Sequence, residues 1–261
     1  MQKYWIPDIP CGMITDDIGF VGGEPVSVHV LTSDEGLVLI DTGYPDMLPG
    51  IRENMEKLGL KLEDGRYIVH SHGHIDHFGT TAEISGISGA KTVIGREDAD
   101  IATGARPLSW AKELDLEPAE TFVPDILISD GDVLELCGRR IRCIHAPGHT
   151  EGTYAFFIDT EVNGVPAVAA MHGGAGMNSM AKAFLEEYGL PLSLRDDFRK
   201  GLEKLRHEKV DVVLGNHPDQ NDTAEKMSRL ENGVNPFLCP EEWQALLNRF
   251  EKQLDDMLAA E

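Results

Sequence analysis

The sequence contains no apolar run near the roughly 18 residues that a membrane-spanning helix needs. Its start, MQKYWIPDIP, lacks the basic region and apolar stretch of a secretory signal. Cysteine is also scarce: Cys11, Cys137, Cys143 and Cys239 are scattered, and only Cys137 and Cys143 are placed to meet, across an expected hairpin at 138–140. These absences predict a cytoplasmic protein whose cysteines are reduced.

Basic residues are few, with 23 Lys and Arg against 45 Asp and Glu, which gives a formal net charge of −22. A surface of this sign repels polyanions and anionic membranes, so neither a nucleic-acid partner nor a membrane partner is expected. Metal ions bound by some of the carboxylates would return positive charge locally, so small anionic substrates stay compatible with this composition. We therefore expect a small-molecule substrate.

Low-complexity tracts and Gly/Pro-rich linkers are absent, and 261 residues are enough for one large hydrophobic core. Short apolar runs alternate with segments of helical character, which predicts α/β layers in a single domain over 1–261. Helices are expected at 47–58 and 194–207, where Asp46 and Ser193 are placed to cap them. A third is expected after Pro240, where apolar residues keep the three-and-four spacing of one helix face.

Five apolar runs of strand length each end abruptly at polar residues. They are 37–40 before Asp41, 67–69 before His70, 141–144 before His145, 167–171 before His172, and 210–214 before Gly215, Asn216 and His217. Loops at strand ends are where rigid scaffolds usually present functional groups. The five endings therefore predict one shared edge that carries a site.

The strongest signal is the segment HSHGHIDH at 70–77, which holds four of the ten histidines and leaves a predicted strand. His72 and His74 are two residues apart, so in an extended backbone their imidazoles point the same way and can bind one metal ion. Asp76 and His77 then face a neighbouring position. Zinc binds neutral imidazole nitrogens and carboxylate oxygens, and a catalytic zinc keeps one position open for water or substrate.

This cluster alone cannot complete two such sites, so further ligands must come from distant segments. His149 in APGHT and His217 in GNHP are the best placed, since each follows an apolar strand. The sequence thus predicts two zinc ions, one bound by His72, His74 and His149, and the other by Asp76, His77 and His217.

These segments resemble the metallo-β-lactamase fold superfamily of metallohydrolases. The resemblance spans LVLIDTG at 37–43, HSHGHIDH at 70–77, HAPGHT at 145–150 and VVLGNHP at 212–218. It implies an α/β fold of the four-layer αββα sandwich type, with the metal ions at one edge between its two halves. It also implies that Asp41 contacts and orients metal ligands, rather than only capping a turn.

Many members of that superfamily have a metal-bridging Asp in a Gly-Asp pair, where this chain reads AMHGGA at 170–175. The chain resembles instead the subclass that lacks this bridging ligand and uses Asp, His and His for the second zinc. His172 lies near the missing Asp and is a candidate for a ligand or a substrate contact. His70 and His145 are expected to be buried or to support the ligands.

The resemblance and the ligand set predict a zinc-dependent hydrolase that uses a metal-bound hydroxide to cleave a small ester, thioester, lactone or β-lactam. Asp76 is the candidate catalytic residue, placed to bind metal, orient the hydroxide and pass a proton. The loops at 106–121 and 175–192 are expected to select the substrate.

Three alternatives remain within the same superfamily. An iron-dependent oxidoreductase is disfavoured because flavodiiron sites need Glu where this chain has His74. A nuclease is disfavoured by the net charge. A metal-binding protein without turnover is disfavoured by the complete set of candidate ligands.

Overall fold

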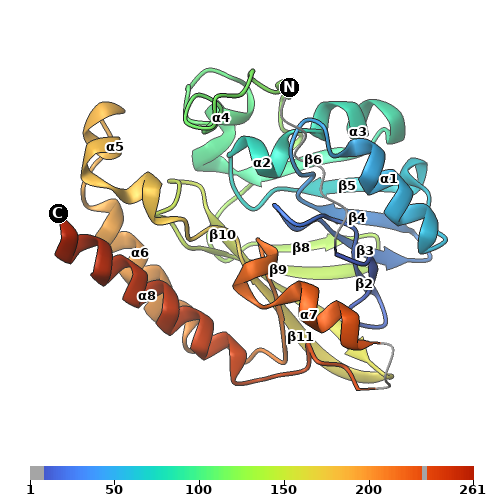
Figure 1. The fold of residues 1–261 in the computed structure, drawn as a ribbon. Helices are drawn as coiled ribbons and strands as arrows, with labels where there is room; N and C mark the ends of the chain where they lie inside the picture. The colour runs from blue at the N-terminus through green and yellow to red at the C-terminus, as the bar shows by residue number, and fades with distance from the viewer. Residues whose placement is uncertain (1–8, 231–233) are drawn as a thin grey trace.

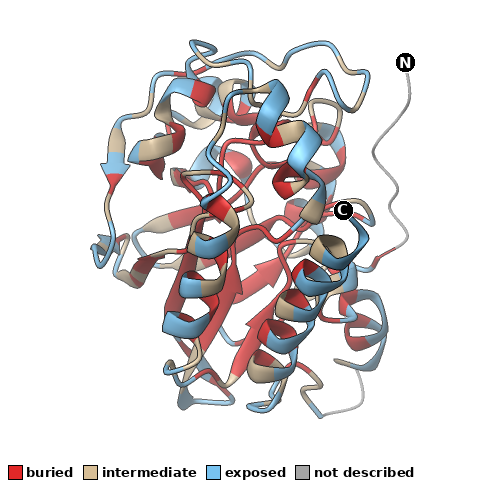
Figure 2. Cartoon of the chain, turned by 90° about the vertical axis from the view of Figure 1, so that its left-hand side faces the viewer, coloured by how far each residue is buried: buried red, intermediate tan, exposed pale blue. Residues whose placement is uncertain are grey.

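The computed structural model describes residues 9–230 and 234–261. Within these residues, a seven-stranded sheet and a five-stranded sheet pack face to face, with helices on both outer surfaces (Figure 1). The sheets are buried, whereas the covering helices expose their outer faces (Figure 2). This is the predicted αββα sandwich, and the predicted fold class is confirmed.

The first sheet follows chain order from β1 to β7. Its first four strands pair antiparallel, and β4 to β7 run parallel, so their carboxyl ends lie at one edge. The strands are β1 (Gly12–Met13), β2 (Ile18–Phe20), β3 (His29–Ser33), β4 (Gly36–Ile40), β5 (Gly65–Val69), β6 (Lys91–Gly95) and β7 (Ile126–Ile128).

The second sheet has the order β12-β11-β10-β9-β8, and only β11 and β12 are parallel. Its strands are β8 (Val133–Leu136), β9 (Arg139–His145), β10 (Tyr154–Val162), β11 (Val165–His172) and β12 (Val212–Leu214). A hairpin with positive φ at Cys137 and Gly138 joins β8 to β9. All four cysteines lie among the described residues, and each is a free thiol.

Side-chain alternation along the strands divides the core into layers. Val38 and Ile40 of β4 face the second sheet, whereas Leu37 and Leu39 face the helices on the outer side. In β10 the same alternation sends Phe156 inward to the first sheet and Phe157 outward. Each sheet therefore has two apolar faces, and both faces need a partner layer.

Helices α1 (Leu48–Lys57) and α3 (Thr81–Ser88) cover the first sheet, and α6 (Leu194–Leu205) and α8 (Glu242–Ala260) cover the second. The three predicted helices are thus confirmed. Ser193 directly precedes α6, as expected of a cap, but the predicted capping hydrogen bond is wrong, because its hydroxyl makes none. The remaining α-helices among the described residues are α2 (Ile75–Phe78), α4 (Ala99–Ala102), α5 (Lys182–Glu187) and α7 (Thr223–Arg229).

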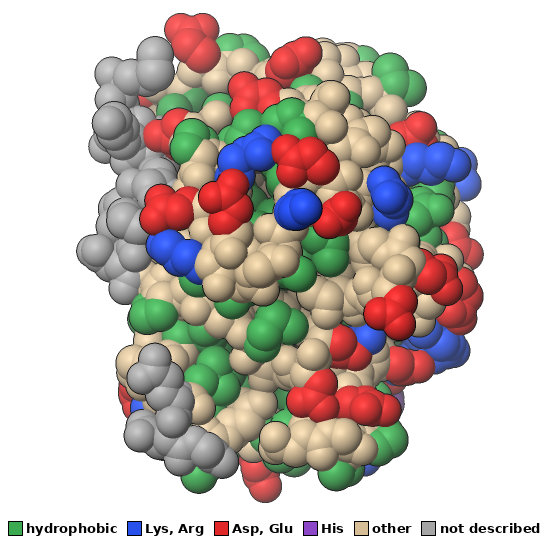
Figure 3. Space-filling view, turned by 90° about the vertical axis from the view of Figure 1, so that its right-hand side faces the viewer, with side chains coloured by type: hydrophobic (Ala, Val, Ile, Leu, Met, Phe, Trp, Pro, Cys, Tyr) green, Lys and Arg blue, Asp and Glu red, His purple; other side chains and the backbone are tan. Residues whose placement is uncertain are grey.

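Acidic side chains are spread over the face shown in Figure 3, with a smaller number of Lys and Arg side chains among them. This face has no continuous basic stripe of the kind that binds a polyanion. Among the described residues, none of the helices combines the length and the apolar composition needed to cross a bilayer.

Candidate metal centre

The HSHGHIDH segment changes conformation in its middle. After β5 the chain bends at 71–73 and is extended at His74, which has φ −88° and ψ 149°, and α2 begins at Ile75. His72 and His74 lie side by side, with ring centroids 4.6 Å apart. Asp76 and His77 lie in the short helix, which turns them toward a different position from the first pair.

The structure brings the predicted ligands together in two overlapping groups. Candidate ligand atoms of His72, His74 and His149 all lie within 4.8 Å of one another, as do those of His72, Asp76 and His77. His217 joins the second group, because its Nε2 lies 3.3 Å from Nε2 of His77 and 3.5 Å from Oδ2 of Asp76. Residues from both sheets thus meet at one edge, as the strand endings predicted.

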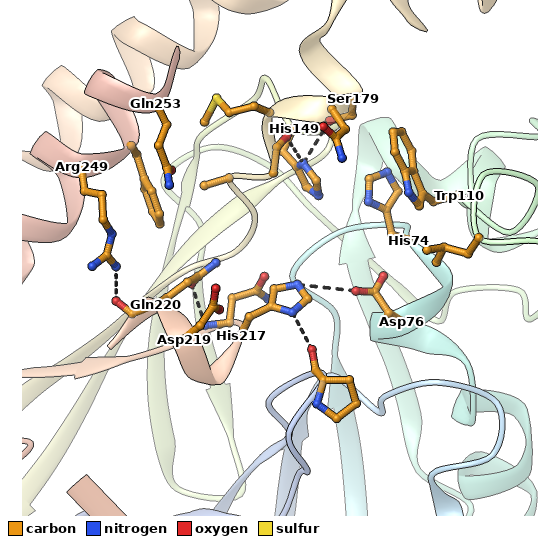
Figure 4. Close-up of a pocket in the computed structure, with 18 of the residues that line it drawn as sticks. His74, Asp76, Trp110, His149, Ser179, His217, Asp219, Gln220, Arg249 and Gln253 are labelled. Atoms are coloured by element: carbon orange, nitrogen blue, oxygen red, sulfur yellow. Dashed lines mark hydrogen bonds and ion pairs between the residues drawn. The ribbon is translucent and has the colours of Figure 1, made fainter. Parts of the chain in front are cut away.

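Backbone carbonyls hold two of these imidazoles in one tautomer. Nδ1 of His149 donates to the carbonyl oxygen of Gly176 at 2.9 Å, and Nδ1 of His217 donates to that of Pro25 at 2.8 Å (Figure 4). A carbonyl oxygen only accepts, so the proton of each neutral ring is on Nδ1. The lone pair of each ring is then on Nε2, the atom that can bind a metal ion.

The Asp41 carboxylate orients the other side of the centre. Its Oδ2 accepts hydrogen bonds from the Ser71 hydroxyl at 2.8 Å and from Nδ1 of His77 at 2.9 Å. Because the Ser71 hydroxyl gives its proton to Asp41, its oxygen must accept from Nδ1 of His72 at 3.0 Å. Nε2 of His72 is buried and has no hydrogen-bond partner among the described residues. An orphaned imidazole lone pair of this kind fits a bound metal ion.

The electrostatics of the first group suit a metal ion. Burial lowers the pKa values of His72 and His74 well below the usual range, and lowers that of His149 to about 4. All three rings are therefore neutral at pH 7, which is the state that binds zinc.

The second group carries charge. Burial alone would raise the pKa of Asp76, but neighbouring His77 and His217 outweigh burial and lower it. Burial opposes the charged form of His77 as well, yet Asp76 and Asp41 raise its pKa above the usual range. His77 thus lies between two carboxylates that attract a cation, and a metal ion bound there would displace the proton.

The structure places His172 outside both groups. Its ring contacts Phe198 of α6 and Phe250 of α8, and the backbone N–H of Gly174 donates to its Nδ1 at 3.3 Å. Strand alternation explains this placement, since His172 lies on the same face of β11 as Ala170, the face that packs on the helices. Burial lowers its pKa to about 3.

His70 and His145 also lie outside the two groups. His70 is buried, with Nδ1 bonded to the Val93 carbonyl at 2.9 Å and Nε2 to the Thr81 hydroxyl at 2.7 Å. Nε2 of His145 bonds to the carbonyl oxygen of Glu151 at 2.7 Å. His70 is therefore a buried structural residue, and His145 supports the loop that carries His149.

A pocket of about 770 Å³ opens over the two groups, and His74, Asp76, His149 and His217 form its floor (Figure 4). Trp110 stands beside His74, with ring centroids 5.4 Å apart, and its backbone has φ +67°. Such strain in a non-glycine residue is concentrated at functional sites.

Both loops that were expected to select the substrate contribute to this pocket. Trp110 and Leu114 come from the first, and Met177, Asn178 and Ser179 come from the second. On the opposite side, α8 presents Arg249 and Gln253. Met180 and Leu185 are buried.

Sequence reasoning missed several residues that position the centre. Besides Ser71, the Nδ2 amide of Asn216 donates to both Asp41 and Ser71 at 3.3 Å. The Ser179 hydroxyl lies 3.0 Å from Nδ1 of His149. For Ser71 and Asn216 the sequence held a signal, because each directly precedes a predicted ligand.

The chain belongs to the metallo-beta-lactamase superfamily, whose family model matches residues 21–161. Its structure is similar to BJP-1, a subclass B3 metallo-beta-lactamase of Bradyrhizobium japonicum, with a TM-score of 0.89 and 27% identity over 100% of this chain and 97% of that chain. The resemblance stated from the sequence is thus confirmed.

Two curated relatives match a smaller part of the chain. An N-acyl homoserine lactonase of a Bacillus species is 27% identical over 165 residues, which cover 54% of this chain and 60% of that protein. A hydroxyacylglutathione hydrolase of Maricaulis maris is 27% identical over 152 residues, which cover 58% of this chain and 46% of that protein. The match thus spans about half to three fifths of these relatives.

Proposed function

We propose that this protein is a zinc-dependent hydrolase that cleaves a small ester, thioester, lactone or β-lactam. The observation that carries the proposal is the convergence of the six predicted ligands beneath one pocket, with Nδ1 of His72, His149 and His217 engaged elsewhere, so that Nε2 carries the lone pair in each ring. By their names, the relatives hydrolyse an N-acyl homoserine lactone and a hydroxyacylglutathione, and the similar structure is a metallo-beta-lactamase.

Under this proposal, His72, His74 and His149 bind one zinc ion, and Asp76, His77 and His217 bind a second. When bound, zinc lowers the pKa of a water molecule to about 7 and polarises a carbonyl oxygen. Asp76 lines the pocket, and its lowered pKa keeps it ionised at neutral pH. Its carboxylate can then accept a hydrogen bond from the attacking water, which orients the water, and can take up its proton.

The walls of the pocket add to this role. The Trp110 ring lies against both His74 and Phe184, and the Trp110–Phe184 centroids are 4.6 Å apart. Trp110 gives the pocket an aromatic wall on this side. The substrate's apolar part is expected against this wall.

The test is a panel of lactone, thioester, ester and β-lactam substrates, assayed before and after removal of metal by a chelator. We expect activity on at least one class, its loss in the metal-free protein and its return when zinc is added back. Activity that is indifferent to metal removal would refute the proposal. Metal analysis of protein purified from cells separates the alternatives. Predominant iron together with redox activity would favour an oxidoreductase. Bound zinc without turnover would favour a binding protein.

The remaining expectations belong to the same proposal. The αββα layers draw on segments from β1 to α8, which supports one domain over 1–261. The acidic net charge supports a small-molecule substrate rather than a nucleic acid. A cytoplasmic location also stays a prediction.

A further inference from the structure

A buried carboxylate outside both ligand groups joins the two loops that carry the three histidines. Asp98 ends a short 3-10 helix (Arg96–Asp98) after β6, and its side chain has no exposed surface. Its Oδ2 accepts hydrogen bonds from the backbone N–H of Gly73 at 2.8 Å and from the Thr150 hydroxyl at 2.7 Å. Its Oδ1 accepts one from the backbone N–H of Gly152 at 2.8 Å.

The positions of these donors relate Asp98 to the metal centre. Gly73 separates His72 from His74, and Thr150 directly follows His149. The Asp98 carboxylate therefore binds a residue adjacent in sequence to each of the three histidines. The two loops start in different sheets, β5 in the first and β9 in the second.

The packing around Asp98 leaves little freedom. A Cβ atom added at Gly152 would lie 2.5 Å from Cγ of Asp98, so the second loop approaches the carboxylate as closely as a glycine permits. Thr153 reinforces this loop, because its hydroxyl accepts from the backbone N–H of Thr150 at 3.0 Å. The carboxylate is thus held in a fitted site.

The three groups that point at Asp98 are all hydrogen-bond donors, so both of its carboxylate oxygens must accept. The donors are two backbone N–H groups and one hydroxyl, and an ionised carboxylate is the side chain that only accepts. Burial raises the pKa of Asp98 to about 6, while the hydrogen bonds from Thr150, Gly73 and Gly152 oppose the rise. An amide at this position would turn an NH2 group toward at least one donor, which is unfavourable in a buried site.

We infer that Asp98 is a positioning residue that fixes the distance between the His72–His74 pair and His149, so that the three-histidine site is formed before the metal ion binds. The inference rests on the proposed metal site. When Asp98 already holds the two loops together, metal binding does not have to order them. Loss of the hydrogen bonds to Asp98 is therefore expected to weaken metal affinity.

The test measures zinc affinity of the metal-free protein by competition with a chelating indicator. All variants are made in a His217→Gln background, so that only the three-histidine site keeps its full set of ligands. In this background, Asp98→Asn is expected to lower zinc affinity about 10- to 100-fold. Asp100→Asn, the same chemical change at an exposed side chain two residues further on, is the matched control and should leave the affinity unchanged.

Urea unfolding of the same metal-free proteins separates positioning from a purely structural role. If Asp98→Asn fails to fold, Thr150→Val removes one donor and should lower zinc affinity in the same direction, and Thr150→Ser, which keeps the hydroxyl, should restore it. Unchanged zinc affinity, with only a lower free energy of unfolding, would overturn the inference. Absence of zinc binding by the unmutated protein would instead refute the proposed metal site itself.

Discussion

Nδ1 of His77 lies 2.9 Å from Oδ2 of Asp41, and both side chains are almost completely buried. Asp41 adopts φ +60°, in the left-handed region where Asn is also tolerated. This geometry directs Nε2 of His77 toward Asp76 and His217. Asp41 thus contacts a candidate ligand, and its role in orienting that ligand stays a prediction.

Asp41→Asn keeps the size and backbone preference of the residue but removes one acceptor. The variant is expected to lose about 10- to 100-fold in affinity for the metal ion of the second group, because His77 is no longer held by a carboxylate. Stepwise zinc titration of metal-free protein measures this. Asp34→Asn, in an exposed turn, is the control. Two unchanged binding steps in Asp41→Asn would contradict the prediction.

Removal of one ligand from each group should separate the two sites. His149→Gln and His217→Gln are each expected to reduce bound zinc by about one ion per chain and to lower kcat/KM about 100-fold or more, since loss of one electrophilic contact in a transition state costs 100- to 1,000-fold. Metal content and hydrolysis rates measure the two effects. His207→Gln changes an exposed ring and should alter neither. Retention of full metal content by either site variant would exclude that residue as a ligand.

Gly174→Ala tests how closely the backbone packs against the centre. An added Cβ would lie 2.4 Å from Cδ2 of His149, so the imidazole must shift away from the position that Gly176 and Ser179 hold. Zinc affinity and activity are expected to fall, by about 10-fold or more. Gly86→Ala in α3 meets nothing within 4 Å and should be neutral or stabilise by about 0.5–1 kcal/mol. Wild-type zinc affinity in Gly174→Ala would show that the ring has room to move.

Acid stability should depend on His29, which belongs to neither ligand group. Burial lowers the pKa of His29 to about 4. Below about pH 6.5 the unfolded chain takes up a proton that the folded protein excludes, so stability present above pH 6.5 is lost as the pH falls toward 4. The loss from this residue approaches about 3 kcal/mol.

His29→Gln cannot titrate and should lose less stability over the same interval. Urea midpoints of metal-free protein at pH 6.5 and 4.5 provide the comparison, with both proteins treated with chelator so that metal release does not contribute. Parallel losses in the two proteins would mean that His29 is protonated in the folded state as well.

The candidate ligand set was predictable because its signals are local. His72, His74 and Asp76 lie in one short segment, and His149 and His217 each follow a strand whose apolar run is visible in the sequence. The α/β layers followed from the same runs, since alternating strands and helices imply layers, whereas the four-layer αββα arrangement followed from the family resemblance.

Asp98 was not predictable, because its burial depends on contacts with residues 25, 52 and 54 positions away. In the sequence it ends an Arg-Glu-Asp run that resembles an exposed turn. His172 illustrates a different limit. Its place at the end of a strand was evident, but the face toward which it points depends on the register of β11 against its neighbours.

His77 and His217 lie 140 residues apart and follow strands of different sheets. An ion shared by both would restrict the unfolded chain as a cross-link does, and closing a loop of about 100 residues removes about 4–5 kcal/mol of chain entropy. The metal centre would then act as a reversible cross-link between the two halves of the sandwich. Cellular zinc supply would in that case govern the lifetime of the folded protein as well as its catalytic rate.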